Sequence, residues 1–341
     1  MATMTDVAIE AKVSHSTVSR VLNSKTEDIK ISQNTVQNVL KAASKLNYHP
    51  NAIARGLVVN KSHAIGVALL DIHYMRFLPF ATIIGGIGDV VGSHDYNLQF
   101  CTTTKEGKNA NHYFMKRWLE KRVDGIVIID QCIPDDEILH LKDSGVPFVL
   151  FDRDIPGEEI NCVVMDNEGG AFQATEHFIK TGHKRIGFLF AGEPHWYIGI
   201  EKLKGYKKAL YMNSLNYDKE LVFSGEFSEG RTSQVLKKLM ALPSRPTALL
   251  TTDDTTGVSI IKAANTMGIK VPDDLAVIGF QEEPIGNIIS PALTSVRTPI
   301  EKSGELAAEM LFELLDGEKL KDNRIVLGTK LIIKKSCGCD K

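Results

Sequence analysis

Short apolar segments alternate with helical patterns after residue 62, and this alternation restricts the possible folds more than any other feature of the chain. The apolar runs are rich in Val, Ile, Leu and Phe, which is typical of strands, and helical spacing lies between them, as at 109–121 and 169–180. Strands that alternate with helices form parallel sheets. A stretch of roughly 280 residues exceeds one hydrophobic core, so we expect an α/β body of two doubly wound halves with a cleft between them. The predicted strands are 64–70, 97–101, 124–129, 147–151, 185–190, 247–250 and 275–280.

The charge of the chain is divided unevenly between its two ends. Residues 1–62 contain eight Lys and Arg against four Asp and Glu, a net charge of +4, whereas the remaining residues contain 32 against 38, a net charge of −6. A basic head on an acidic body suits a head that meets phosphates. No apolar run approaches the roughly 18 residues that a membrane helix needs, and the N-terminus lacks a signal-peptide pattern. We therefore expect a cytoplasmic protein with no membrane partner.

The five cysteines indicate neither a disulfide framework nor a metal site. Cys101, Cys132 and Cys162 lie in or beside apolar runs, as buried reduced thiols do. Cys337 and Cys339 form a single C-x-C, and without a second pair of ligands we interpret them as tail residues. No metal and no cofactor is predicted.

The first 48 residues have the pattern of three short helices. Thr3 and Asp6 have the spacing of a capping box before a first helix, and Ser14 is placed to cap a second helix after a tight connection. A third helix begins at Ser32 and is expected to bury an apolar stripe. The stripe consists of Val36, Val39, Leu40, Ala43 and Leu46. Two helices that cross at a small residue, here Ala11, and a third that covers them form a helix-turn-helix head.

The second of these helices presents side chains suited to reading DNA. Val18, Val21 and Leu22 fall on one face, which packs inward. Ser16, Arg20 and Asn23 point the opposite way, with His15 and Ser19 on the flank. Hydroxyls, an amide, an imidazole and a guanidinium can all form hydrogen bonds with base edges in a major groove. Most solvent-facing helices carry Glu and Lys instead, so this face indicates recognition.

Two long motifs resemble the lactose/galactose repressor family of bacterial transcription regulators. The first is T-D-V-A-x-x-A-x-V-S-x-x-T-V-S-R-V-L-N from Thr5 to Asn23, and the second is Y-H-P-N-A-I-A-R-G-L from Tyr48 to Leu57. The resemblance implies that His15, Ser16 and Arg20 contact bases, with Arg20 the best candidate for a bidentate contact with guanine. It also implies phosphate contacts or helix caps at the remaining positions of the head. These are Thr5, Ser14, Thr17, Ser19 and Asn23.

The segment 49–61 matches the hinge of that family. The resemblance implies a short helix that forms when two copies pair in the minor groove, with Leu57 wedged between base pairs and Arg55 near phosphates or in the groove. Asn51 and Ala54 are the other expected contacts. So short a helix is marginal alone in water, so its formation depends on the DNA and the second copy. The expected partner is a palindromic double-stranded operator bound by a homodimer. An added leucine heptad is missing after Ser336, which favours a dimer over a tetramer.

The family resemblance also divides the body, residues 62–341. The family shares this body with periplasmic sugar-binding proteins, and its chain crosses between the halves near Val163, Thr294 and Ile325. The first half is then about 62–163 and 294–325, and the second about 164–293 and 326–341. Three crossing strands form a hinge that can close on a ligand.

Six residues are the candidate effector contacts, and three of them depart from the sugar-binding members of the family. Lys202 stands where those members usually carry Arg in R-x-x-G, Asp253 replaces Asn in N-D-x-x-A, and Gln281 replaces Asp in G-[FY]-D. Asp152 keeps the family's carboxylate, and Phe227 matches an aromatic ligand position. Phe80 could instead pack in the core. Asp254, which follows Asp253, could instead be the N-cap of a helix that begins at Thr255. Paired donors and acceptors of this kind suit a hydroxyl-rich ligand.

Taken together, these features predict a DNA-binding transcription regulator, with repression as the expected effect, controlled by a small effector such as a sugar. A purine or nucleoside effector, or a phosphoprotein co-regulator, is the alternative within the family. A transport protein would need export, and the chain carries a DNA-binding head in place of a signal peptide. An enzyme would need a nucleophile with a matched base, a phosphate loop or a metal cluster, and Gly85-Gly86-Ile87-Gly88 is not a phosphate-loop motif.

Overall fold

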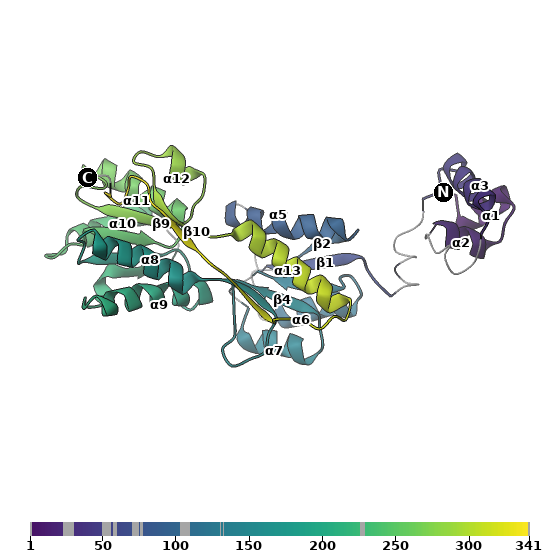
Figure 1. The fold of residues 1–341 in the computed structure, drawn as a ribbon, viewed down its shortest axis with the longest axis horizontal. Helices are drawn as coiled ribbons and strands as arrows, with labels where there is room; N and C mark the ends of the chain where they lie inside the picture. Colours follow the sequence, from purple (N-terminus) through teal and green to yellow (C-terminus); the bar gives the residue numbers. More distant parts are fainter. Residues whose placement is uncertain are drawn as a thin grey trace. The chain divides into compact units, whose positions relative to one another are not determined.

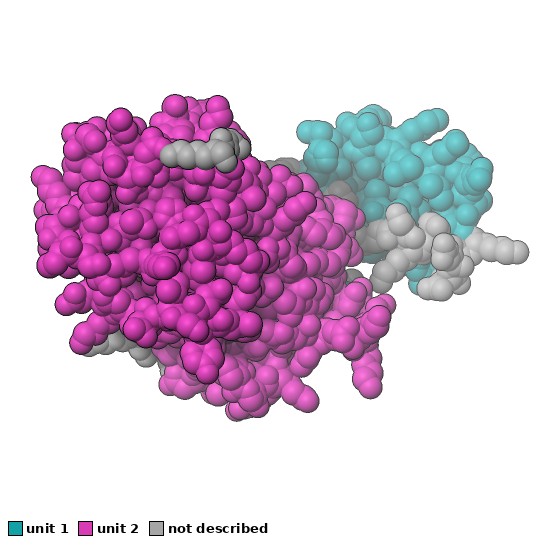
Figure 2. All heavy atoms as spheres, turned by 60° about the vertical axis from the view of Figure 1, so that its left-hand side comes forward, with its two compact units in different colours: residues 1–62 teal, residues 63–341 magenta. Residues whose placement is uncertain are grey.

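The computed structural model divides the chain into two compact units, 1–62 and 63–341 (Figure 2). The structure describes residues 2–22, 31–49, 56, 60–69, 75, 78–102, 110–129, 131, 133–225 and 229–339. Each unit has its own hydrophobic core, so each is described by itself.

The head consists of three helices whose ends are set by local hydrogen bonds. They are α1 (Met4–Ala11), α2 (His15–Leu22) and α3 (Gln33–Lys45). Thr3 and Asp6 form the predicted capping box, in which Thr3 N–H donates to the Asp6 carboxylate at 2.8 Å and Asp6 N–H donates to Thr3 Oγ1 at 3.3 Å. Ser14 Oγ accepts from Thr17 N–H at 3.1 Å at the start of α2, and Ser32 caps α3. All three predicted helix starts are confirmed.

The core of the head is small, and one predicted member is wrong. Leu40 is 51% exposed, whereas Ala42, which the predicted stripe omitted, is buried. Helix α3 therefore packs through a face rotated toward its alanines, with Val39, Ala42 and Ala43 buried against α1 and α2. The buried residues of this core are Val7, Ala8, Val18, Val21, Val39, Ala42 and Ala43.

The body is made of two six-stranded sheets with helices on both faces, as the alternation predicted (Figure 1). The first sheet has the order β11-β5-β4-β3-β1-β2 and is parallel throughout. Its strands are β1 (Ala64–Leu69), β2 (Asn97–Thr102), β3 (Gly125–Ile128), β4 (Phe148–Phe151), β5 (Cys162–Met165) and β11 (Arg324–Leu327). The helices of this half are α5 (Leu78–Ser93), α6 (Ala110–Leu119), α7 (Asp135–Asp143) and α13 (Ile300–Leu315).

The second sheet has the order β12-β10-β9-β8-β6-β7, and only β12 runs antiparallel to its neighbour. Its strands are β6 (Ile186–Phe190), β7 (Val222–Ser224), β8 (Ala248–Thr251), β9 (Ala276–Gln281), β10 (Thr294–Arg297) and β12 (Lys330–Ile332). The helices are α8 (Asn167–Lys180), α9 (Tyr197–Met212), α10 (Glu229–Met240), α11 (Asp254–Thr266) and α12 (Ile285–Ile288), with a short 3-10 turn, η2, at Lys219–Leu221.

Alternation along the buried strands divides the core of each half into two layers. In β3, Val127 packs with α5 and α13, whereas Ile126 and Ile128 pack on the opposite face with α6 and α7. A glycine allows helices to approach closely in each half. A Cβ at Gly86 in α5 would collide with the Glu301 carbonyl of α13, and one at Gly205 in α9 would collide with the Glu168 carbonyl of α8. The glycine run at 85–88 therefore serves helix packing.

The chain crosses between the two halves three times. Strand β5 belongs to the first sheet and α8 to the second half, so the first crossing is at residue 166. The chain returns at residues 298–299, after β10, and leaves again at residues 328–329, between β11 and β12. The yellow C-terminal segment in Figure 1 runs from one half to the other in this way. No helix among the described residues is long and apolar enough to span a membrane.

Candidate functional site

The exposed face of α2 carries the predicted base-reading residues. Val18 and Val21 are buried beneath it, which leaves His15, Ser16 and Arg20 exposed. Thr5 and Ser14 are also exposed, and Thr17 and Ser19 are half-buried. Val18 thus orients the whole face, since a helix with one side fixed in a core must present the opposite side to solvent.

Hydroxyl groups gather at the N-terminus of α2. The Ser14 hydroxyl lies 2.8 Å from the hydroxyls of both Ser16 and Thr17. The backbone N–H groups of a helix N-terminus favour an anion, so this end of α2 is suited to a phosphate. Ser14 is thus both a cap and a possible phosphate contact, and the two roles that the sequence left open for it are compatible in one geometry.

Five of the predicted DNA contacts lie outside the described residues. They are Asn23 at the end of the motif and Asn51, Ala54, Arg55 and Leu57 in the hinge. The second motif begins inside the head, because Tyr48 packs against its core and Tyr48 N–H donates to Ala43 O at 2.9 Å. The first residues of this motif are therefore part of the fold of the head.

In the body, three charged side chains from both halves form a buried cluster. Asp152 follows β4 in the first half, Lys202 lies in α9, and Asp253 stands at the end of β8 in the second half. Asp152 and Lys202 are 2% and 3% exposed, and Asp253 is half-buried. We refer to these three residues as the charged cluster.

Burial shifts every member of the charged cluster toward its neutral form. Desolvation raises the pKa of Asp152 and that of Asp253. It lowers the pKa of Lys202 to about 8, against the opposing pull of the carboxylates of Asp152, Asp253 and Asp254. Within the described part of the chain, no carboxylate lies within ion-pairing distance of Lys202, whose Nζ donates instead to Thr252 O at 3.0 Å. The charges of the cluster are therefore only partly neutralised by one another.

Local geometry positions each of these side chains. Asp152 has a φ of +47°, and its Oδ1 accepts hydrogen bonds from Met165 N–H and Asn167 Nδ2, both at 2.9 Å. Lys202 Nζ lies 3.9 Å from the centre of the Phe280 ring, in cation–π geometry. Asp152 is thus attached to the first crossing between the halves, and Lys202 to the centre of the second sheet.

The alternative role proposed for Asp254 is wrong, because its neighbour is the cap. Asp253 accepts from Thr256 N–H at 2.7 Å and from its hydroxyl at 2.8 Å, and it caps α11. Asp254 is fully buried and accepts from Ser295 Oγ and from Glu283 N–H, both at 2.6 Å. It joins α11 to β10 and to the loop after β9. Burial raises the pKa of Asp254 to about 7.

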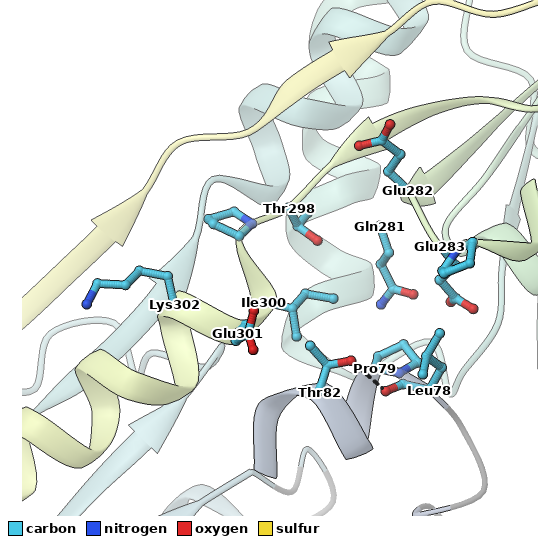
Figure 3. Close-up of a pocket in the computed structure, with 12 residues that line it drawn as sticks. Leu78, Pro79, Thr82, Gln281, Glu282, Glu283, Thr298, Ile300, Glu301 and Lys302 are labelled. Carbon is cyan, nitrogen blue, oxygen red and sulfur yellow. Dashed lines mark hydrogen bonds between the residues drawn. The ribbon is translucent and has the colours of Figure 1, made fainter. Parts of the chain in front are cut away.

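A cavity of about 390 Å³ lies between the two halves, and its lining does not include the residues of the charged cluster. Leu78, Pro79 and Thr82 line it from α5, and residues 281–284 line it from the end of β9. The second crossing and the start of α13, residues 298–302, complete the lining. Figure 3 shows the Gln281 side chain pointing into this space above Thr82 and Pro79. The volume is within the range of small-molecule sites.

Two polar atoms of the cavity wall are buried without a partner. These are Gln281 Oε1 and Thr298 Oγ1. A buried polar oxygen without a hydrogen bond costs free energy, so both atoms favour a bound water or ligand group. Gln281 follows Phe280, whose ring contacts Lys202, so β9 carries a residue of the cavity wall next to a residue that contacts the charged cluster. Sequence reasoning missed Thr298, since nothing local marks an unpaired threonine.

The aromatic candidates are placed differently from the charged ones. Phe80 packs against the core of the first half, which was the alternative considered for it, while its neighbour Pro79 lines the cavity. Phe227 lies outside the described residues. The charged and amide candidates therefore come together, and the described aromatic candidate packs with the core.

A DNA-reading three-helix head joined to a two-halved ligand-binding body defines a class of regulatory protein, and comparisons with known proteins identify its family. Residues 3–51 match the lacI family of bacterial regulatory proteins, and residues 175–337 match a periplasmic binding protein-like domain. The chain is 31% identical over 338 residues to the probable HTH-type transcriptional repressor ExuR of Bacillus subtilis (strain 168), with 98% of each chain covered. It is 30% identical over 334 residues to catabolite control protein A of Priestia megaterium, again with 98% of each covered.

Solved structures agree with the fold over nearly the whole chain. The complex of the transcriptional regulator CelR with cellobiose is 28% identical, with a TM-score of 0.73, 98% of this chain and 100% of that chain covered. The Lac repressor dimer bound to operator and the anti-inducer ONPF has a TM-score of 0.87 with 98% and 99% covered, and its 24% identity supports the fold alone. The chain belongs to the lacI family of bacterial regulatory proteins. It is a DNA-binding transcription regulator and not an enzyme.

Proposed function

We propose that this regulator is a repressor whose operator affinity is controlled by a sugar or sugar derivative bound between the halves of the body. The charged cluster is the observation that carries the proposal. Its ammonium and its two carboxylates come from both halves and are incompletely compensated by each other. Lys202 contacts Phe280, which precedes Gln281 in β9, and Gln281 lines a cavity of about 390 Å³ between the halves. Sugar hydroxyls each donate and accept, so one ligand can satisfy groups of both kinds.

Among the described aromatic residues, the placement of Phe80 and Phe280 favours a sugar over a purine or nucleoside. A base would need an exposed aromatic face for stacking. Phe280 is the aromatic ring in contact with the charged cluster, and Lys202 Nζ covers its face at 3.9 Å. Phe80 packs with the core. One related structure, CelR, is a complex with cellobiose.

Two residues of the proposed site are attached to the segments where the chain crosses between the halves, so a bound ligand would act on the hinge directly. Asp152 is bonded to Met165 and Asn167, which flank the first crossing. Thr298, with its unpaired hydroxyl in the cavity wall, lies in the second crossing. A ligand that binds better to one closure state shifts the balance of states by that difference in affinity. The same geometry serves an inducer or a corepressor.

A thermal-shift screen of the full-length protein against sugars, sugar phosphates and nucleosides tests the effector class. A ligand present at about a hundred times its dissociation constant stabilises the folded protein by about 2.7 kcal/mol. We expect a sugar to raise the melting temperature and to change operator affinity in gel shifts. A shift by nucleosides alone would support the purine alternative. A change in operator affinity that requires an added phosphoprotein would support the co-regulator alternative.

On the DNA side, we propose that a homodimer places two copies of α2 on a palindromic operator. His15, Ser16 and Arg20 would read bases, whereas Thr5, Ser14, Thr17, Ser19 and Asn23 would hold phosphates. The exposure of His15, Ser16 and Arg20 above buried Val18 supports their role as readers. The proposed domains are the head at 1–48, the hinge at 49–61 with Asn51, Ala54, Arg55 and Leu57 at the DNA, and the body at 62–341.

Leu57→Ala tests the proposed wedge in the minor groove. We expect operator binding to weaken more than tenfold at constant salt, about 1.4 kcal/mol or more, because alanine cannot fill the space between separated base pairs. Gel shifts or fluorescence anisotropy measure the change. Leu57→Met, which keeps an apolar side chain of similar volume, is the matched control and should retain most of the affinity. Unchanged binding by the alanine variant would remove the wedge from the mechanism.

A further inference from the structure

Three potential metal ligands, none of them a candidate effector contact, meet in the second half of the body. They are His177 near the end of α8 and Cys337 and Cys339 in the tail after β12, and their donor atoms all lie within 4.8 Å of one another. His177 Nε2 is 2.8 Å from Cys339 Sγ, and the two sulfurs are 3.1 Å apart. Among the described residues, no other group of three or more His, Cys, Asp or Glu side chains has its donor atoms so close together.

The fold holds the tail in the position that brings these donors together. Ser336 Oγ accepts from Thr294 N–H at 2.8 Å and donates to Val277 O at 2.6 Å, which attaches the tail to β10 and β9. Cys337 is then 1% exposed and packs in the core beside α8. Gly338 has a φ of +78°, a conformation that glycine adopts without strain. The chain turns there, and both sulfurs face His177.

The donors are of the kind and number that a thiophilic ion requires. Zn²⁺ is bound by cysteine thiolates and histidine nitrogen in tetrahedral sites, with Zn–S bonds of about 2.3 Å and Zn–N bonds of about 2.05 Å. In such a tetrahedron two sulfurs lie roughly 3.8 Å apart, and a sulfur and a nitrogen roughly 3.5 Å apart. Each of the two short distances observed here must therefore widen by less than about 1 Å, which side-chain rotation can provide.

We propose that His177, Cys337 and Cys339 form a site for a thiophilic metal ion of the Zn²⁺ class. The ion would replace the thiol protons, which leave as it binds, and the fourth position would accept water or another ligand. The imidazole distinguishes this proposal from a simple thiol pair. A disulfide would draw the two sulfurs to about 2.05 Å and give the histidine no bond. A metal ion uses all three donors.

The bound ion would fasten the C-terminal tail to α8. The tail pairs with the second sheet through β12 and Ser336, so the metal would join the sheet to the helix that covers it. Because the ion binds the folded arrangement, it would stabilise the second half by mass action. This proposal does not depend on the effector, so either can fail without the other.

Cobalt binding to the full-length protein tests the site. The reduced, chelator-treated protein is titrated with Co²⁺, and we expect thiolate-to-metal absorption and tetrahedral d–d bands at one equivalent, both abolished by Zn²⁺. His177→Gln and Cys339→Ser should weaken binding about tenfold or more. The exposed His140→Gln and the buried Cys162→Ala are controls for the imidazole and the thiol, and they should bind like the unmodified protein. Circular dichroism establishes that each variant is folded.

A second measurement on the unmodified protein guards against loss of folding in the variants. Zn²⁺ should raise the melting temperature of the chelator-treated protein, and added chelator should lower it again. Undiminished cobalt affinity in His177→Gln and Cys339→Ser would overturn the proposal. The absence of tetrahedral bands from the reduced protein would also overturn it. A disulfide between Cys337 and Cys339 that forms in air, together with the absence of these bands, would assign the pair to thiol chemistry instead.

Discussion

The head and the body build their candidate sites in opposite ways. The proposed readers of the head, His15, Ser16 and Arg20, come from a single eight-residue helix, and they are exposed because Val18 of the same helix is buried. The charged cluster of the body takes Asp152, Lys202 and Asp253 from three segments about fifty residues apart along the chain, and burial shifts the pKa of each. One site is a property of a helix, and the other is a property of a packed domain.

This difference suits the two ligands. DNA is large and strongly charged, and an exposed face gains most of its affinity from phosphates without burying its own charges. A small effector must be enclosed to gain enough contacts, so the polar groups of its site are buried even in the absence of the ligand. The body can do this because two sheets and their helices exclude solvent around the cluster, whereas the head has a core of seven buried apolar residues.

The largest expected contrast between the units is in the dependence of stability on pH. Burial raises the pKa of Asp254 to about 7, so the folded body holds this proton more tightly than the unfolded chain does. The contribution of this group is complete below about pH 4 and is lost as pH rises toward 7, with a ceiling of roughly 4 kcal/mol. Glu283, whose pKa is also raised to about 7, acts in the same direction.

Asp254→Asn measures this contribution. Urea unfolding of the body transition at about pH 5 and about pH 8 should show a smaller loss of stability in the variant than in the unmodified protein. The exposed Asp95→Asn is the control and should keep the original difference. In the head the sign is opposite, because hydrogen bonds from Thr3 lower the pKa of Asp6, whose contribution is lost as pH falls. Equal pH slopes in the two aspartate variants would contradict this assignment.

The next effect concerns ligand binding by the charged cluster. Lys202→Met removes the buried ammonium while keeping an apolar stem of similar length. We expect effector affinity to fall about a hundredfold, close to 3 kcal/mol, because the carboxylates lose their cationic partner and the ligand its donor. Isothermal calorimetry with the effector from the thermal-shift screen measures the loss. Lys204→Met, on the exposed side of the same helix, should bind normally, and equal affinities for the two variants would exclude Lys202 from the site.

A core substitution in the head should lower the stability of the head without changing that of the body. Val18→Ala leaves a cavity beneath the reading face and should destabilise the head by about 2 kcal/mol, with the body transition and effector binding unchanged. Hydrogen exchange resolves the two units. Leu40→Ala, at a position that is 51% exposed in the same head, is the matched control and should have little effect. Loss of protection throughout the body would show that the two units fold as one.

The last of these effects is the most specific. Arg20→Ala should cost about 1 to 3 kcal/mol in operator binding and relax the preference at one base step, since a guanidinium in the major groove reads guanine by two hydrogen bonds. Binding to a set of operators with single base changes, at one salt concentration, measures both. Arg20→Lys keeps the charge and should recover affinity without the preference. A uniform loss on every operator would assign Arg20 to a phosphate.

Local signals explain most of what could be predicted from the sequence. The caps at Thr3, Ser14 and Ser32 depend on residues three positions apart, and seven strands were marked by apolar runs. Strands β7 and β12 were missed because each is a three-residue strand at the edge of its sheet and contains no buried residue. The choice between Asp253 and Asp254 as the cap of α11 was also beyond local reasoning, because adjacent aspartates have equal propensity and Ser295, forty-one residues on, holds the second one.

The sequence by itself determined the class of this protein, because its motif, its helix caps and its alternating segments are read over short distances along the chain. Only the tertiary structure decided which polar residues are buried and which distant side chains meet. It unites Asp152 with Lys202, leaves Thr298 unpaired in the cavity wall, and brings His177 to Cys337 across 160 residues. Burial and long-range contact depend on how sheets and helices pack, and no residue carries that information alone.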